Sequence, residues 1–206
     1  TNDASSGESI TPIVEFSHVN LTYAGAGDES LTGISFTALR GQTIGVIGGT
    51  GSGKSTLLRL MSGVYVPDSG AVLYDGKDAT LPAVREDVFF LPDDPFYAGQ
   101  TTGKGIFDTY PTFYPNLDRE LYRRLLERFK LDENAHQRNF SKGMRRQAAT
   151  ALAIAEENPY IFFDETFDGL DPFKRGYIKH ILREETRSRG TTVIITSHSL
   201  RELEDV

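Results

Sequence analysis

The sequence predicts an α/β fold in which a parallel sheet carries a phosphate-binding loop and a helical lobe is inserted into the sheet. Three short runs, at 88–91, 160–163 and 192–196, have the length and the apolar character of buried strands. Such strands, separated by helices, are typical of a parallel sheet covered on both faces. A glycine-rich run at 48–56 joins an apolar segment to the start of a helix. Residues 93–158 contain two capped helical patterns, which indicates the inserted lobe.

The composition is that of an ordinary globular domain and excludes several classes of site. The chain has 206 residues, a net charge of −7 and no cysteine. The length fits one domain, and the missing thiols exclude disulfides, thiolate metal sites and cysteine nucleophiles. The acidic balance argues against a broad nucleic-acid surface. No window approaches eighteen uncharged apolar residues, so no membrane span is predicted. The polar start lacks an apolar signal region, and we expect residues 1–11 to be a disordered lead-in or linker.

The segments around the glycine-rich run predict a second, antiparallel sheet. Apolar residues alternate from Ile13 to Tyr23, and another strand pattern runs from Leu31 to Leu39. A further strand at 71–74 leads into Asp75-Gly76, a dipeptide that favours a hairpin turn. We therefore expect these strands to form a partly exposed β subdomain.

The run from Gly48 to Thr56 fits the pattern G-x-x-x-x-G-K-[ST] at every fixed position. Its glycines let successive backbone N–H groups point inward at phosphates, and the following helix N-terminus favours negative charge. Lys54 can reach the β- and γ-phosphates, and the Ser55 hydroxyl can ligate Mg²⁺. The sequence therefore predicts that a nucleoside triphosphate binds to Gly48, Gly49, Thr50, Gly51, Ser52, Gly53, Lys54, Ser55 and Thr56.

A second motif indicates that the bound triphosphate is hydrolysed. The apolar strand 160–163 ends in Asp164 and Glu165. An aspartate at a strand end beside a phosphate loop can hold Mg²⁺, and Glu165 can act as a general base on the attacking water. A polar turn after a strand is common, but behind a complete phosphate loop the catalytic interpretation is favoured.

Two helices are predicted in the lobe and one after it. Asp118 can cap a helix that runs to about Lys130, with its apolar face formed by Leu121, Leu125, Leu126 and Phe129. Ser141 can cap a second helix that ends at Asn158-Pro159 and carries Met144, Ala148, Leu152 and Ala155. A third helical stretch runs around 176–187. We expect the basic cluster of Lys142, Arg145 and Arg146 to be a solvated helix face.

From about Ile13 to its end the chain resembles the nucleotide-binding domain of ATP-binding cassette (ABC) proteins. The run 140–144 stands where the family has its signature sequence, and 167–172 is similar to its D-loop. His198 resembles the family's switch histidine, and Tyr23 its adenine-stacking aromatic residue. The resemblance implies a P-loop NTPase (RecA-like) core at 12–92 and 159–206, with an antiparallel β subdomain and a helical subdomain at 93–158.

The resemblance also implies ATP and Mg²⁺ as ligands and assigns roles to individual residues. Lys54, Glu165 and His198 would be catalytic, and Ser55, Asp164 and Asp93 would ligate the metal. Tyr23 would bind the base, and Ser141, Gly143 and Asp171 would contact a nucleotide held by a second subunit. Two departures affect these roles. Asp93 stands near the family's usual glutamine, where a carboxylate could ligate Mg²⁺ or repel the triphosphate. Lys142 and Met144 replace a usual glycine and glutamine in the signature.

The resemblance implies the motor domain of a transporter, located in the cytoplasm and peripheral on the inner face of the membrane. Its partners would be a second copy of itself or a homologous ATPase subunit, and a separate membrane permease, with no nucleic acid. The stretch from Phe96 to Tyr114 is equally consistent with a permease contact and with ordinary packing.

Two other functions stay open: an ABC ATPase outside transport, or a nucleotide-gated dimerisation module with little turnover. The first eighty or so residues resemble exporter cassettes and the later part resembles stand-alone ATPase subunits, so a mosaic chain also stays open.

Overall fold

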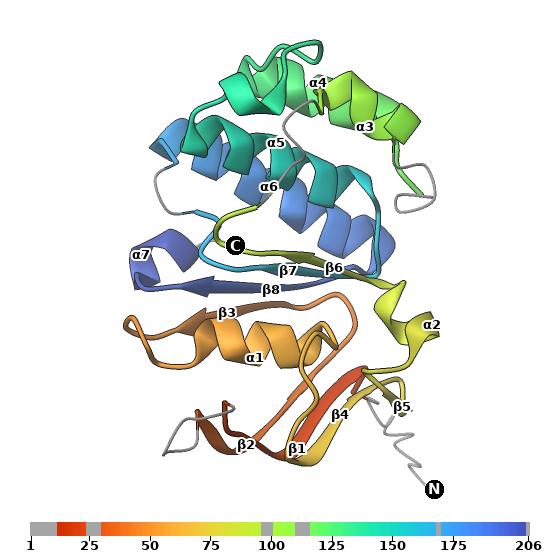
Figure 1. The fold of residues 1–206 in the computed structure, drawn as a ribbon, viewed down its shortest axis with the longest axis vertical. Coiled ribbons are helices and arrows are strands. Elements are labelled where there is room, and N and C mark those ends of the chain that lie inside the picture. Colours follow the sequence, from red (N-terminus) through yellow and green to blue (C-terminus); the bar gives the residue numbers. More distant parts are fainter. Residues whose placement is uncertain (1–11, 24–29, 96–100, 110–115, 168–169, 205–206) are drawn as a thin grey trace, which may run out of the picture.

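The computed structural model describes residues 12–23, 30–95, 101–109, 116–167 and 170–204. The chain forms stacked layers (Figure 1), with helix α1 (Lys54–Met61) lying between two sheets. Helices α5 (Lys142–Ala155) and α6 (Pro172–Arg189) cover the far side of the parallel sheet, and α4 (Arg119–Phe129) lies beyond them. The predicted α/β fold, with a parallel and an antiparallel sheet, is confirmed.

The parallel sheet has the strand order β3-β8-β7-β6. In register, Ile47 of β3 pairs with Ser197 of β8, and Ile195 of β8 pairs with Phe163 of β7. The carboxyl ends of these three strands therefore lie side by side, which is where ligands bind in sheets of this kind. The strands are β3 (Thr43–Ile47), β6 (Val88–Leu91), β7 (Tyr160–Phe163) and β8 (Thr192–Ser197).

The second sheet is antiparallel, as predicted, with the order β2-β1-β4-β5. His18 has a φ of 49° and interrupts the pairing of β1, so the buried positions of this strand jump from Phe16 to Val19. Asp75 and Gly76 form the expected hairpin turn, with φ of 47° and 75°. The strands are β1 (Val14–Leu21), β2 (Leu31–Ala38), β4 (Ser69–Tyr74) and β5 (Lys77–Asp78).

The helices between β6 and β7 fall in the segment expected to be a helical lobe. The Asp118 carboxylate caps α4 by accepting hydrogen bonds from the N–H groups of Glu120 and Leu121, both at 2.9 Å. Leu125, Leu126 and Phe129 are buried on this helix as predicted, and Tyr122 is buried with them while Leu121 is only partly buried. The other elements are α2 (Pro82–Arg85), α3 (Gly103–Thr109), a 3₁₀ turn (Gln137–Asn139) and α7 (Leu200–Leu203).

Each face of the parallel sheet packs into its own core. Phe163 and Ile195 point to the side of α4, α5 and α6. Phe162 and Ile194 pack on the other side against Leu58 of α1 and its neighbours. The alternation of side chains along a strand explains this division, and burial on both sides explains why these strands are continuously apolar. In the described part of the chain, no helix combines the length and the apolar character needed to cross a membrane.

Candidate functional site

A pocket of about 460 Å³ lies where β3 ends and α1 begins. The loop between them turns through Gly51 and Gly53, whose φ angles of 81° and 88° are unfavourable for residues with a side chain. The first N–H groups of α1 have no acceptor within the helix, so they are available to an anion at this end. The pocket is lined by Tyr23, Ser30, Thr50, Gly51, Ser52, Gly53, Lys54, Ser55, Thr56, Asp93 and Glu165.

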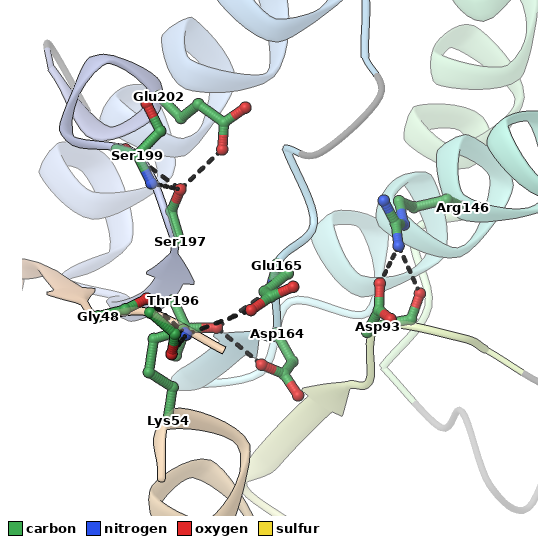
Figure 2. A network of polar contacts seen from close by, with 11 residues as sticks. Gly48, Lys54, Asp93, Arg146, Asp164, Glu165, Thr196, Ser197, Ser199 and Glu202 are labelled. Carbon is green, nitrogen blue, oxygen red and sulfur yellow. Dashed lines mark hydrogen bonds and ion pairs between the residues drawn. The ribbon is translucent and has the colours of Figure 1, made fainter. Parts of the chain in front are cut away.

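Lys54 holds a buried positive charge inside the loop (Figure 2). Its Nζ donates to the carbonyl oxygens of Gly48 at 2.7 Å and Gly49 at 3.0 Å. It also lies 3.3 Å from Oε1 of Glu165, while the lysine side chain is only 5% exposed. Three oxygen partners compensate for the loss of water around the ammonium group. Two residues predicted to be catalytic are therefore in direct contact.

Thr196 fixes the two acidic residues that follow β7. Its Oγ1 donates to Oδ1 of Asp164 at 2.7 Å and accepts from the backbone N–H of Glu165 at 3.0 Å. Asp164 is 2% exposed. Glu165 has a φ of 49°, a left-handed conformation that is uncommon outside glycine and is frequent at functional sites. Sequence reasoning missed Thr196, although its position follows from the register in which Phe163 faces Ile195.

The segment after β8 brings His198 to the same edge of the sheet. The backbone N–H of Gly48 donates to the carbonyl oxygen of Ser197 at 3.3 Å, which ties this segment to the phosphate loop. Ser197 is buried and His198 is exposed. His198 is therefore exposed directly after a buried residue that is hydrogen-bonded to the phosphate loop.

Tyr23 lines the pocket and contacts helix α1. Its hydroxyl forms a hydrogen bond of 2.6 Å with Oγ1 of Thr56. Its ring packs edge-on against Tyr65, with 5.7 Å between ring centroids. Arg59 in turn lies 5.8 Å from the Tyr65 ring centroid. Tyr65 and Arg59 were not predicted to support the site, because neither belongs to a recognised motif.

Asp93 lines the pocket from the end of β6, but its carboxylate forms an ion pair with Arg146 of α5 (Figure 2). The same Arg146 nitrogen donates to the backbone carbonyl of Asp93 at 2.8 Å. Arg146 is 7% exposed, so the expectation that it belongs to a solvated face is wrong. The structure instead uses this arginine to join the pocket wall to the helical lobe.

Seven of the predicted residues are not part of the pocket lining: Gly48, Gly49, Ser141, Gly143, Asp164, Asp171 and His198. Ser141 caps α5 as expected, and its Oγ accepts from the N–H of Met144 at 3.2 Å. Asp171 caps α6 by accepting from the N–H of Lys174 at 3.0 Å. Residues 168–169 of the predicted D-loop and most of the aromatic stretch 96–114 fall outside the described residues.

The oxygen donors at the pocket fit Mg²⁺ delivered with a triphosphate. This ion is usually held by one or two carboxylates together with substrate phosphates. Ser55 lines the pocket, and Thr196 at the end of β8 donates a hydrogen bond to the buried carboxylate of Asp164. The Ser55 hydroxyl and the Asp164 carboxylate are the hard oxygen ligands that Mg²⁺ prefers.

Comparison with known proteins gives one family and many relatives. A family model described as "ABC transporter" matches residues 31–168. ABC transporter ATP-binding protein YtrB of Bacillus subtilis is 32% identical over 86% of this chain and 61% of its own length. Energy-coupling factor transporter ATP-binding protein EcfA2 of Thermotoga maritima is 31% identical over 91% of this chain and 73% of its own length. Each alignment spans both halves of the chain.

Solved structures that resemble this chain are also described as parts of ABC transporters. A structure described as the ATP-binding subunit of an ABC transporter superposes with a TM-score of 0.80 at 26% identity, over 92% of this chain and 80% of the other. CbiO1 of Clostridium perfringens, described as part of the transporter complex cbiONQ, has a TM-score of 0.68 at 27% identity, over 91% and 79%. The chain spans only 55% to 61% of the length of three curated relatives.

Proposed function

The chain belongs to the ABC transporter family, and on this basis we propose that it is the ATP-binding and ATP-hydrolysing motor of a transporter. It works as a dimer around two nucleotides and powers a separate membrane permease. The observation that carries the proposal is the contact between Lys54, at the start of α1, and Glu165, which follows the buried carboxylate of Asp164 at the end of β7.

ATP binding is the task of the loop and of Lys54. The backbone of residues 48–53 and the first turn of α1 surround the phosphates, and the Lys54 ammonium exchanges its contacts with Gly48, Gly49 and Glu165 for phosphate oxygens. Charge-assisted hydrogen bonds of this kind are roughly twice as strong as neutral ones. Tyr23, which lines the pocket, stacks on the base.

Ser55 and Asp164 hold Mg²⁺, which neutralises charge on the phosphates when it is bound. Asp93 can join them once its carboxylate leaves Arg146. Glu165 orients the attacking water and takes its proton at a carboxylate oxygen. It is available for this role when Lys54 moves to the phosphates, because the ion pair between the two side chains then opens.

His198 contributes a hydrogen bond to the γ-phosphate from the neighbouring strand end. Ser141, Gly143 and Asp171 lie outside the pocket of their own chain, and we assign them to the nucleotide of a second copy. The free N–H groups that follow Ser141 at the start of α5 form an anion site suited to that role.

A permease and a position on the inner face of the membrane complete the proposal. Support comes from the family and from relatives named as ATP-binding proteins of transporters. A second candidate is a nucleotide-gated module with little turnover, and the contacts that restrain Glu165 and Asp93 favour it.

The test is the rate of ATP hydrolysis as a function of protein concentration, with Mg²⁺ present. A dimeric motor gives a rate per chain that rises with concentration and then saturates. Nucleotide-dependent dimers without measurable hydrolysis would instead support the second candidate. A rate per chain that stays constant, with no dimer in sizing experiments, contradicts both.

A further inference from the structure

Helix α7 is one turn long, yet it carries a buried carboxylate with two strong partners. Glu202 is 8% exposed. Its Oε2 accepts a hydrogen bond of 2.7 Å from the Ser197 hydroxyl (Figure 2), and its Oε1 lies 3.5 Å from Nη2 of Arg175 on α6. A buried charge needs such partners. None of these three residues belongs to the set assigned to ATP above.

The first partner, Ser197, fixes the backbone on both sides of His198. The Ser197 hydroxyl accepts from the N–H of Ser199 at 2.9 Å and lies 3.1 Å from the Ser199 carbonyl oxygen. The Ser197 carbonyl accepts from the N–H of Gly48 in the phosphate loop at 3.3 Å. The Ser197 hydroxyl therefore joins the two residues that flank His198, and it donates a hydrogen bond to Glu202.

The second partner, Arg175, reaches the segment that precedes α6. Its Nη2 also donates to the carbonyl oxygen of Leu170 at 3.2 Å, next to Asp171. Helix α7 is held on α6 a second time, because Nζ of Lys179 donates to the backbone carbonyl of Glu204. The Glu202 carboxylate thus connects Ser197, which precedes His198, to Arg175 in the first turn of α6.

We propose that Glu202 and Arg175 are positioning residues, which set the orientation of His198 through Ser197. The proposal rests on the proposed function of His198 in ATP hydrolysis. It predicts that losing the negative charge on Glu202 changes the placement of the imidazole without weakening ATP binding, because neither Glu202 nor Arg175 lines the pocket.

The first experiment measures the hydrolysis rate in a double-mutant cycle. Glu202→Gln keeps the size of the side chain but loses its charge, and we expect kcat to fall about 10-fold with KM for ATP changed less than about 2-fold. In a His198→Ala background the same change should lower kcat by less than about 2-fold, since a positioning residue has nothing left to position. An equal loss in both backgrounds means that Glu202 acts on folding or on another group, and it overturns the proposal.

The matched control is Glu184→Gln, which removes the same charge from an exposed position on α6. It should leave kcat and KM unchanged. Arg175→Lys keeps the positive charge and should retain more activity than Arg175→Ala. Equal losses in these two variants contradict a role for the ion pair.

The second experiment does not need hydrolysis. NMR of ¹³C-labelled histidine in the whole chain resolves the imidazole signals of His18, His136, His180 and His198. Glu202→Gln should shift or broaden the His198 signal and leave the His18 signal unchanged. An unchanged His198 signal overturns the proposal even if the protein proves to have no ATPase activity, whereas a shifted signal without ATPase activity counts only against the proposed function.

Discussion

At the scale of single residues, the main feature of the site is the contact between a cation and the carboxylate expected to act as a base. Lys54 has three oxygen partners, and Glu165 is one of them. In the proposed mechanism, phosphate oxygens replace the Glu165 carboxylate at Lys54 and so release both side chains from this ion pair. The left-handed backbone of Glu165 and its N–H contact with Thr196 keep the carboxylate at this position.

Replacing Lys54 with alanine should weaken ATP binding by about 10- to 100-fold, because hydrogen bonds to charged groups contribute about 1.5 to 3 kcal/mol. Titration with a fluorescent ATP analogue measures the change. Lys77→Ala, at the exposed hairpin, is the matched control and should bind normally. Unchanged binding by Lys54→Ala contradicts the phosphate-loop assignment.

Replacing Glu165 with glutamine should slow hydrolysis by about 10²-fold or more, because the general base is lost. ATP should bind at least as tightly as before, since the change also frees Lys54 from its ion pair. Single-turnover kinetics and a binding titration separate the two effects. If hydrolysis continues at the original rate, another group is the base.

At the scale of helices and strands, the sequence predicts best where one local pattern suffices. The strands β6 and β7 fall on the predicted residues, because four consecutive apolar side chains are all needed at a buried sheet. Helix α3 was not predicted, since Gly103 and Gly105 lower helix propensity and no apolar period marks it. Its start is supported by the Thr102 hydroxyl, which accepts from the N–H of Gly105 at 2.8 Å.

The supporting contacts of the site could not be predicted for a related reason. Thr196 is 32 residues from Asp164, and Arg146 is 53 residues from Asp93. Only the fold brings such partners together, and nothing local marks them. Lys54 could be found because it belongs to a motif of fixed spacing, and Asp164 and Glu165 because they directly follow an apolar strand.

The end of helix α5 predicts a pH dependence of stability. Glu156 follows this helix, is 2% exposed, and accepts a hydrogen bond from the N–H of Asn116 at 3.3 Å. Burial, with a smaller contribution from the Glu157 carboxylate, raises the pKa of Glu156 from 4.5 to about 7. The folded state therefore holds a proton that the unfolded state loses, and stability falls as the pH rises from 4.5 through 7.

Glu156→Gln should remove this loss, so the variant should melt roughly 5 °C above the parent chain at pH 8 and close to it at pH 5. Thermal unfolding followed by circular dichroism at both values gives the comparison. Glu184→Gln, an exposed change, should show no such difference. Equal melting temperatures of parent and Glu156→Gln at pH 8 would mean that the buried carboxyl does not titrate in this range.

At the scale of the whole molecule, the layers divide the predicted site residues into two separate groups. The phosphate loop, the acidic residues and His198 gather at the carboxyl edge of one sheet, while Ser141 and Asp171 cap helices outside the pocket lining. In the proposed dimer, the capped helix of one copy closes the pocket of the other. Arg146 and Asp93 join the two regions within each chain.

The most direct test of this account is the mass of the Glu165→Gln variant in solution, measured by light scattering with and without MgATP. Because this variant should bind ATP without hydrolysing it, we expect monomers without nucleotide and dimers of twice the 22.8 kDa chain mass with MgATP. Adding Ser141→Arg, which places a bulky side chain at the start of α5, should abolish the dimer. A mass that stays monomeric when the pocket is saturated with ATP would contradict a site completed by a second copy.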